Sequence, residues 1–217
     1  MKISASNGRP ESLAGFTLIE MIGVLAIIGI LAGVLAPKVF DAVARSRING
    51  AAVSYNSVKT STVDYFAKNG TFPLRDGTGA ADTATPTGRF DADLLNGGFV
   101  EKLFSCAIGS QLTAGPLTQR PHMRSQTAVA AAVPVITATV GGNNFNLDGV
   151  AAADFTTAMT VVSLVIPGVS ITDAISLNKI IDGVTNVGAA QDVTGRCMYS
   201  TPAANNTVTV YIYVAHN

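Results

Sequence analysis

Charged side chains are scarce in this chain of 217 residues, and the few that are present balance. Only 13% of the residues are charged, and the 14 basic and 14 acidic residues give a formal net charge of zero. Ordinary soluble domains carry about 25% charged residues. The balance excludes an acidic disordered chain and a strongly basic protein, so we expect no specific binding of nucleic acid. The deficit predicts that part of the chain lies in a membrane, in an assembly or outside the cell.

Cysteine and histidine are also rare, and their positions exclude the common catalytic and metal-binding motifs. The two cysteines, Cys106 and Cys197, are too few for a zinc framework. They fit a disulfide in an oxidising compartment, and two free buried thiols are the alternative. His122 and His216 have no carboxylate or cysteine at ligand or triad spacing, and no G-x-S-x-G, P-loop or H-E-x-x-H motif is present. We therefore predict that the protein is not an enzyme.

One long apolar run lies near the N-terminus. Residues 16–36 contain a single ionisable side chain, Glu20. As a helix they would be about 31 Å long, which matches the hydrocarbon thickness of a bilayer of about 30 Å. A core helix would be apolar on one stripe only. A signal peptide would have a shorter apolar region and no proline directly after its cleavage site, where this chain has Pro37. The run therefore predicts a retained membrane-spanning helix.

Glu20 is out of place in such a segment, because burying a carboxylate in a membrane costs energy unless it is paired. The next basic residue along the chain is Lys38. A free amino group at Phe16 would supply the missing charge if residues 1–15 were removed. The alternative is that Glu20 reaches the membrane surface and needs no partner.

The residues around Glu20 carry a specific resemblance. A short leader with Lys2 and Arg9 ends in Gly15, and the sequence FTLIE follows from Phe16 to Glu20. This segment resembles the N-terminus of type IV prepilins and of the pseudopilins of type II secretion systems. Gly29 and Pro37 also fall where these families place a helix-softening glycine and a proline. Independently of the resemblance, Pro37 with Gly29 and Gly33 predicts a softened helix, because proline removes one backbone hydrogen bond and glycine weakens the others.

The resemblance implies a role for each of these residues. The Gly15–Phe16 bond would be cut by a prepilin peptidase, which would also methylate the new amino group of Phe16. Glu20 would neutralise that amino group on a neighbouring subunit as the protein leaves the bilayer for a filament, and a buried charge requires such pairing. The implied partners are copies of this chain and related pilins, the peptidase, the assembly machinery of the inner membrane and, before assembly, membrane lipid.

The rest of the chain predicts an α+β fold. Residues 1–15 form the leader, residues 16–36 the transmembrane and assembly helix, residues 37–69 an amphipathic stalk helix and residues 70–217 a globular head. The stalk stripe expected from the 3.6-residue period consists of Phe40, Ala44, Ile48, Ala51, Tyr55, Val58 and Tyr65 or Phe66, with Thr62 as an interruption.

The head is expected to contain a mostly antiparallel sheet that packs on the stalk helix. Residues 70–124 are expected to form an irregular connection with a short helix at 91–104. The expected strands cover residues 127–140, 159–166, 193–200 and 207–214, the last with alternating buried and solvated faces. A further helix over residues 173–182 is expected to be capped by Thr172 and to end at Gly183.

No cofactor is expected, although one segment is loosely similar to a calcium loop. Asp76, Gly77, Thr78, Gly79 and Asp82 supply oxygens, but their spacing does not match an EF-hand. Major pseudopilins carry calcium in their heads, so calcium stays an alternative to the simpler role of these glycines in turns.

The sequence therefore predicts a structural subunit of a type IV pilus-like or pseudopilus filament. It would be a single-pass protein of the inner membrane with its head outside the cytoplasm, and later part of a periplasmic pseudopilus or a surface pilus. The alternative is a membrane-anchored binding module that does not polymerise.

Overall fold

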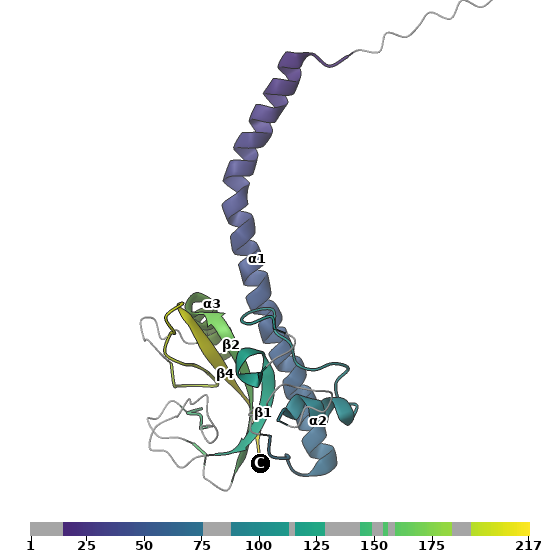
Figure 1. Cartoon of the computed structure of the whole chain (residues 1–217), viewed down its shortest axis with the longest axis vertical. Helices are drawn as coiled ribbons and strands as arrows, with labels where there is room; N and C mark the ends of the chain where they lie inside the picture. The colour runs from purple at the N-terminus through teal and green to yellow at the C-terminus, as the bar shows by residue number, and fades with distance from the viewer. Residues whose placement is uncertain are drawn as a thin grey trace, which may run out of the picture. The chain divides into compact units, whose positions relative to one another are not determined.

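The computed structural model confirms an α+β fold (Figure 1). It describes residues 15–75, 88–112, 116–128, 144–148, 154–155, 159–183 and 192–217. The elements are α1 (Leu18–Asn69), α2 (Phe90–Asn96), a short 3-10 helix η1 (Leu117–Gln119), β1 (His122–Thr127), β2 (Thr160–Ser170), α3 (Ile171–Asp182), β3 (Cys197–Tyr199) and β4 (Thr207–His216). The chain divides into two compact units, Met1–Ala44 and Arg45–Asn217, and each is described by itself.

Helix α1 begins two residues later than expected and ends where expected. It continues through Pro37 and ends at Asn69, after which Gly70 adopts a left-handed φ of 75°. Gly70 also donates its backbone N–H to the carbonyl of Phe66 at 2.7 Å. This is the usual helix stop, because glycine adopts positive φ without a steric penalty.

The stalk stripe is confirmed from Ile48 to Val58, within the compact unit Arg45–Asn217, whereas Phe40 and Ala44 belong to the other unit. The buried residues of α1 follow steps of three and four: Ile48, Ala51, Tyr55, Val58 and Thr62. Phe40, in contrast, is 73% exposed. Thr62 continues the stripe instead of interrupting it, because its hydroxyl donates to the carbonyl of Val58 at 2.8 Å and is therefore satisfied in a buried position.

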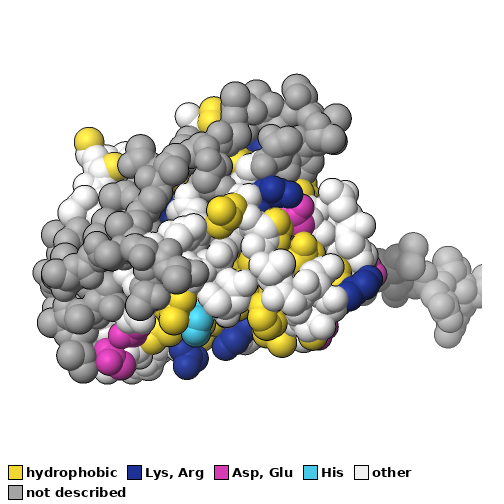
Figure 2. Space-filling view, turned by 90° about the horizontal axis from the view of Figure 1, so that it is seen from below, with side chains coloured by type: hydrophobic (Ala, Val, Ile, Leu, Met, Phe, Trp, Pro, Cys, Tyr) yellow, Lys and Arg dark blue, Asp and Glu magenta, His cyan; other side chains and the backbone are white. Residues whose placement is uncertain are grey.

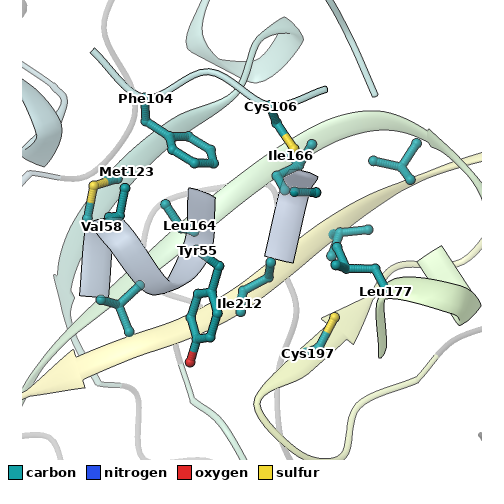
Figure 3. Close-up of a cluster of buried hydrophobic side chains, with 14 of the residues drawn as sticks. Tyr55, Val58, Phe104, Cys106, Met123, Leu164, Ile166, Leu177, Cys197 and Ile212 are labelled. Atoms are coloured by element: carbon teal, nitrogen blue, oxygen red, sulfur yellow. The ribbon is translucent and has the colours of Figure 1, made fainter. Parts of the chain in front are cut away.

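The strands form one antiparallel sheet with the order β1-β2-β4-β3. Leu164 of β2 lies between Met123 of β1 and Ile212 of β4, and Ile212 also pairs with Cys197 of β3. These residues share a hydrophobic core with the buried stripe of α1, so the residues of α1 from Ile48 onward pack on the sheet (Figure 3). The packing of the stalk on the sheet is as expected.

Three of the four expected strands appear as β2, β3 and β4, and one strand was missed. Strand β1 falls in the segment that was expected to be irregular, because its sequence HMRSQT contains one apolar residue and shows no alternation. The strand expected at 127–140 lies outside the described residues beyond Ala128.

The two short helices correct the expected boundaries. Helix α2 ends at Asn96 instead of residue 104, because two glycines follow and Gly98 has a φ of 73°. Helix α3 ends at Gly183 as expected, but its cap is Ser170, whose hydroxyl oxygen accepts from the backbone N–H of Asp173 at 3.2 Å. Thr172 lies in the first turn instead.

The sheet is covered on both faces, which corrects the expectation of one solvated face. A second hydrophobic cluster joins Phe145 and Phe155 to side chains of β2, β3 and β4. Tyr211 of β4 belongs to this cluster and is 3% exposed. The guanidinium of Arg124 lies 4.9 Å from the centroid of the Tyr211 ring. The side chains of these two polar residues therefore help to cover this second face of the sheet.

The structure also corrects the expected disulfide, because Cys106 and Cys197 are both free and buried. The segment that follows Cys106 bonds to β2, where Ser110 N–H donates to the carbonyl of Pro167 at 2.8 Å. Cys197 lies on β3, which β4 separates from β2. In Figure 3 the two sulfurs point into the same core but do not meet. Burial is the main cause that raises the pKa of both thiols.

Candidate assembly and processing segment

The residues of the predicted cleavage bond lie outside the helix. Gly15, Phe16 and Thr17 precede α1 and have no regular secondary structure. Phe16 is 81% exposed, and a Cβ added to Gly15 would meet nothing within 4 Å. A protease binds its substrate in extended form, so the backbone here is open to such binding without unwinding the helix.

Thr17 and Glu20 together cap the start of α1. One carboxylate oxygen of Glu20, Oε2, accepts from the backbone N–H of Thr17 at 2.8 Å and from its hydroxyl at 2.7 Å. The backbone N–H of Glu20 donates to the hydroxyl oxygen of Thr17 at 3.3 Å. This is a capping box, in which two residues three positions apart satisfy each other's free N–H groups.

Sequence reasoning missed Thr17, although the signal was present. The pattern T-x-x-E directly before an apolar run is the usual sign of a capping box. A carboxylate in the first turn is also favoured by the partial positive charge of the helix N-terminus. Glu20 therefore has a local partner within its own chain, which was not expected.

That local partner is neutral, so it does not cancel the charge of Glu20. The ion pairs between described residues are Arg75–Asp93 and Arg89–Asp91, both in the head. Within the described part of Met1–Ala44, Glu20 thus combines a satisfied hydrogen-bonding geometry with an uncompensated negative charge. A cation brought from another molecule could complete it.

The helix behind Glu20 presents apolar side chains on all sides. Helix α1 contains a window that is long and apolar enough to cross a membrane, and none of that window is buried in the structure. The exposed large apolar residues of this stretch are Leu18, Ile19, Met21, Ile22, Val24, Leu25, Ile27, Ile28, Ile30, Leu31, Val34 and Leu35. An apolar helix surface of this kind is stable only when lipid or other protein shields it from water.

The glycines of this stretch occupy open positions in the isolated chain. A Cβ added to Gly29 or Gly33 would meet nothing within 4 Å. The helix stays continuous at Pro37. The softening of the helix by Gly29, Gly33 and Pro37 is therefore a prediction that the static structure leaves open.

The titratable groups of the head form structural networks. Asp91 accepts from both Nε and Nη2 of Arg89, from the backbone N–H of Phe104 at 2.8 Å and from that of Met123 at 3.3 Å. His122 is also buried, and this burial is the main cause that lowers its pKa to about 4, so the ring is neutral at pH 7. Its Nδ1 lies 3.0 Å from the carbonyl oxygen of Arg120.

Two further carboxylates hold the backbone before β3. Asp182 accepts from the backbone N–H groups of Arg196 at 3.0 Å and Cys197 at 2.8 Å. Asp192 accepts from the side chain of Asn178 and from Thr194. Burial is the main cause that raises the pKa of Asp182. These contacts account for both carboxylates as structural groups.

Metal sites receive no support from the described residues. No group of three or more His, Cys, Asp or Glu that could hold a metal ion occurs among them. The loop of Asp76, Gly77, Thr78, Gly79 and Asp82 lies outside the described residues. On the face of the head in Figure 2, the Lys and Arg side chains in view are dispersed among hydrophobic ones and form no continuous basic patch.

Comparison with known proteins shows that the chain is similar to type IV pilins and fimbrial proteins. The chain is 37% identical over 71 residues to type IV major pilin protein PilE1 of Neisseria gonorrhoeae, covering 33% of each chain. It is 40% identical over 76 residues to fimbrial protein EcpC of Eikenella corrodens, covering 35% of this chain and 49% of that one. It is 28% identical over 107 residues to a fimbrial protein of Neisseria meningitidis serogroup B, covering 48% of this chain and 63% of that one.

The extent of these matches is limited. The chain spans between about a third and just under two thirds of the length of these relatives. No family model matches the chain, and no solved structure matches it.

Proposed function

We propose that the chain is a member of the type IV pilin family and a structural subunit of a type IV pilus-like filament, because it is similar to type IV pilins and fimbrial proteins over as much as 48% of its length. The observation that carries the proposal is the exposed apolar stretch of α1, which begins with the charged and locally capped Glu20. The apolar side chains of this stretch must be shielded from water, and neighbouring copies of the same helix can bury them because they have the same length and the same apolar surface. The head would then form the outer surface of the filament.

Assembly requires a positive charge for each Glu20. We infer that residues 1–15 are removed by a prepilin peptidase and that the new, methylated amino group of Phe16 supplies this charge to a neighbouring copy. Methylation leaves the amine cationic, so the attraction persists. Because Thr17 holds the Glu20 carboxylate at the helix start, each subunit would present it in a fixed position.

Before assembly, the same stretch would anchor the chain in the inner membrane with the head outside the cytoplasm. Lipid would cover the apolar side chains until the assembly machinery moves the subunit into the filament. The apolar stretch and the capped carboxylate suit a surface pilus and a periplasmic pseudopilus equally.

Substitution of Gly15 tests the proposal. We expect Gly15→Leu to remain at full length in the membrane and to reduce the sheared filament fraction at least about tenfold, because the bulky side chain blocks close approach of a protease to the backbone. Gly23→Leu is the matched control, since a Cβ there also meets open space, and its precursor should be cleaved like wild type. Cleavage and assembly of Gly15→Leu at wild-type levels would refute the proposed processing.

A further inference from the structure

Two exposed segments of the chain carry the acceptor motif for N-linked glycans, which the proposed filament role does not use. The motif is asparagine, any residue except proline, and then serine or threonine. It occurs at residues 69–71 (Asn-Gly-Thr) and at residues 205–207 (Asn-Asn-Thr). A motif this short also arises by chance, so the side-chain geometry of each asparagine is the evidence that decides between the two sites.

Asn205 lies in the exposed turn between β3 and β4. Residues 203–206 are all exposed, and Thr207 is the first residue of β4. Two backbone bonds fix the turn: Ala203 N–H donates to the carbonyl of Thr207 at 2.8 Å, and Asn206 N–H donates to the carbonyl of Ala203 at 2.9 Å. Asn206 has a φ of 59°, which asparagine tolerates better than most residues. A bulky group on Asn205 would therefore extend from a well-defined turn into solvent.

The side chain of Asn205 is held so that its amide nitrogen faces away from the turn. Its Oδ1 accepts from the hydroxyl of Thr207 at 2.7 Å and from the backbone N–H of Thr207 at 3.3 Å. A backbone N–H can only donate, so the atom that faces it is the oxygen of the amide and not the nitrogen. This Asx-turn joins the two residues that define the motif. Among the described residues, no hydrogen bond uses Nδ2 of Asn205, the atom to which a glycan is attached.

Asn69 has the opposite arrangement. It is the last residue of α1, and its Nδ2 donates to the carbonyl oxygen of Tyr65 at 3.0 Å. The hydroxyl oxygen of Thr71 accepts from Nδ2 of Asn217 at 3.4 Å instead of bonding to Asn69. The nitrogen that would react is therefore occupied, and the two residues of the motif are not joined. A transferase that acts on the folded head would have to unwind the end of α1 at this site.

We propose that Asn205 carries an N-linked glycan and that Asn69 does not. The donor is a lipid-linked glycosyl diphosphate, and a glycosyltransferase catalyses the step. The bond between Nδ2 of Asn205 and the anomeric carbon forms, and the bond between that carbon and the diphosphate oxygen breaks. The electron pair of the broken bond leaves with the lipid diphosphate, and the amide gives one proton to a base of the transferase. The proposal rests on the proposed position of the head outside the cytoplasm but not on filament assembly.

Glycopeptide mass spectrometry of the full chain from its native cell tests the proposal. We expect the peptide that contains Asn205 to carry the mass of a glycan and the peptide that contains Asn69 to be unmodified. Protease treatment of spheroplasts from the same culture shows whether the head is outside the cytoplasm. An exported head that lacks a glycan on Asn205, or that carries one on Asn69, would overturn this proposal alone. A head that is protected from the protease would overturn the proposed location as well.

Variants of the two motifs distinguish N-linked transfer from other modifications of the same peptide. We expect Asn205→Gln and Thr207→Ala each to lose the whole mass of the glycan, because each removes a residue that the motif requires. Thr207→Ser retains the hydroxyl and should retain the glycan. Asn69→Gln is the matched control at the other motif and should keep the mass of the wild-type protein apart from the substitution itself. A glycan that persists in Thr207→Ala, or that is lost in Asn69→Gln, would overturn the proposal.

Discussion

Glu20→Gln is expected to reduce the filament fraction at least about tenfold while the protein is still inserted and cleaved. Glutamine preserves the shape of the side chain and can also occupy the third helical position of a capping box, so the start of α1 should stay intact. Only the charge is lost. The Phe16 ammonium of the neighbouring subunit would then enter an apolar environment without a counter-charge, which opposes every subunit contact.

Thr17→Ala is the matched control for this substitution. It removes the hydroxyl that bonds to Glu20 but retains the carboxylate, so it separates the capping role from the charge. We expect Thr17→Ala to assemble at close to the wild-type level, and Glu20→Asp to lie between wild type and Glu20→Gln because its reach is shorter by one methylene group.

The assay compares sheared filament with the membrane pool at equal expression. If Glu20→Gln assembles like wild type after correct cleavage, the charge-pair mechanism is wrong. If Thr17→Ala loses assembly as fully as Glu20→Gln, the helix cap is required as well as the charge.

Asp91→Ala is expected to lower the free energy of unfolding of the head by about 3–5 kcal/mol. The carboxylate is 1% exposed, and its removal leaves the guanidinium of Arg89 buried without its counter-charge. It also removes the acceptor for two backbone N–H groups, those of Phe104 and Met123, which link the chain at Phe104 and strand β1 to α2. Chemical denaturation followed by circular dichroism measures the change, since the chain contains no tryptophan.

Asp93→Ala is the control two positions further along the same helix turn. Asp93 pairs with Arg75, but the two side chains are 20% and 32% exposed, so this pair is screened and should contribute about 1 kcal/mol or less. Both substitutions remove one negative charge from the first turn of α2, which cancels the effect on the helix dipole. Equal losses in the two variants would show that burial of the Arg89–Asp91 pair does not determine its contribution.

The sequence predicted those features that depend on local patterns. The 3.6-residue period located the buried residues of α1 from Ile48 to Val58, and the alternation of β4 located its core face. Gly70 and Gly183 marked the ends of two helices, because a helix end of this kind depends only on a local positive φ, which glycine adopts readily.

Features that depend on distant contacts were not predictable in this way. Strand β1 is buried although most of its side chains are polar, because Arg124 packs on Tyr211 and the strand bonds to β2. The second hydrophobic cluster uses Phe145 and Phe155, which lie in segments without regular structure. The disulfide expected from the presence of two cysteines depends on whether the fold brings their sulfurs together, and the structure has Cys106 and Cys197 as free, buried thiols.

Mass spectrometry of the sheared filament fraction from the native cell tests the central claim most directly. The account predicts a filament subunit whose chain begins at Phe16 and carries one methyl group, about 14 Da, on its N-terminal amine. A protein that retains Met1, stays in the membrane and is missing from the sheared filaments would contradict the account.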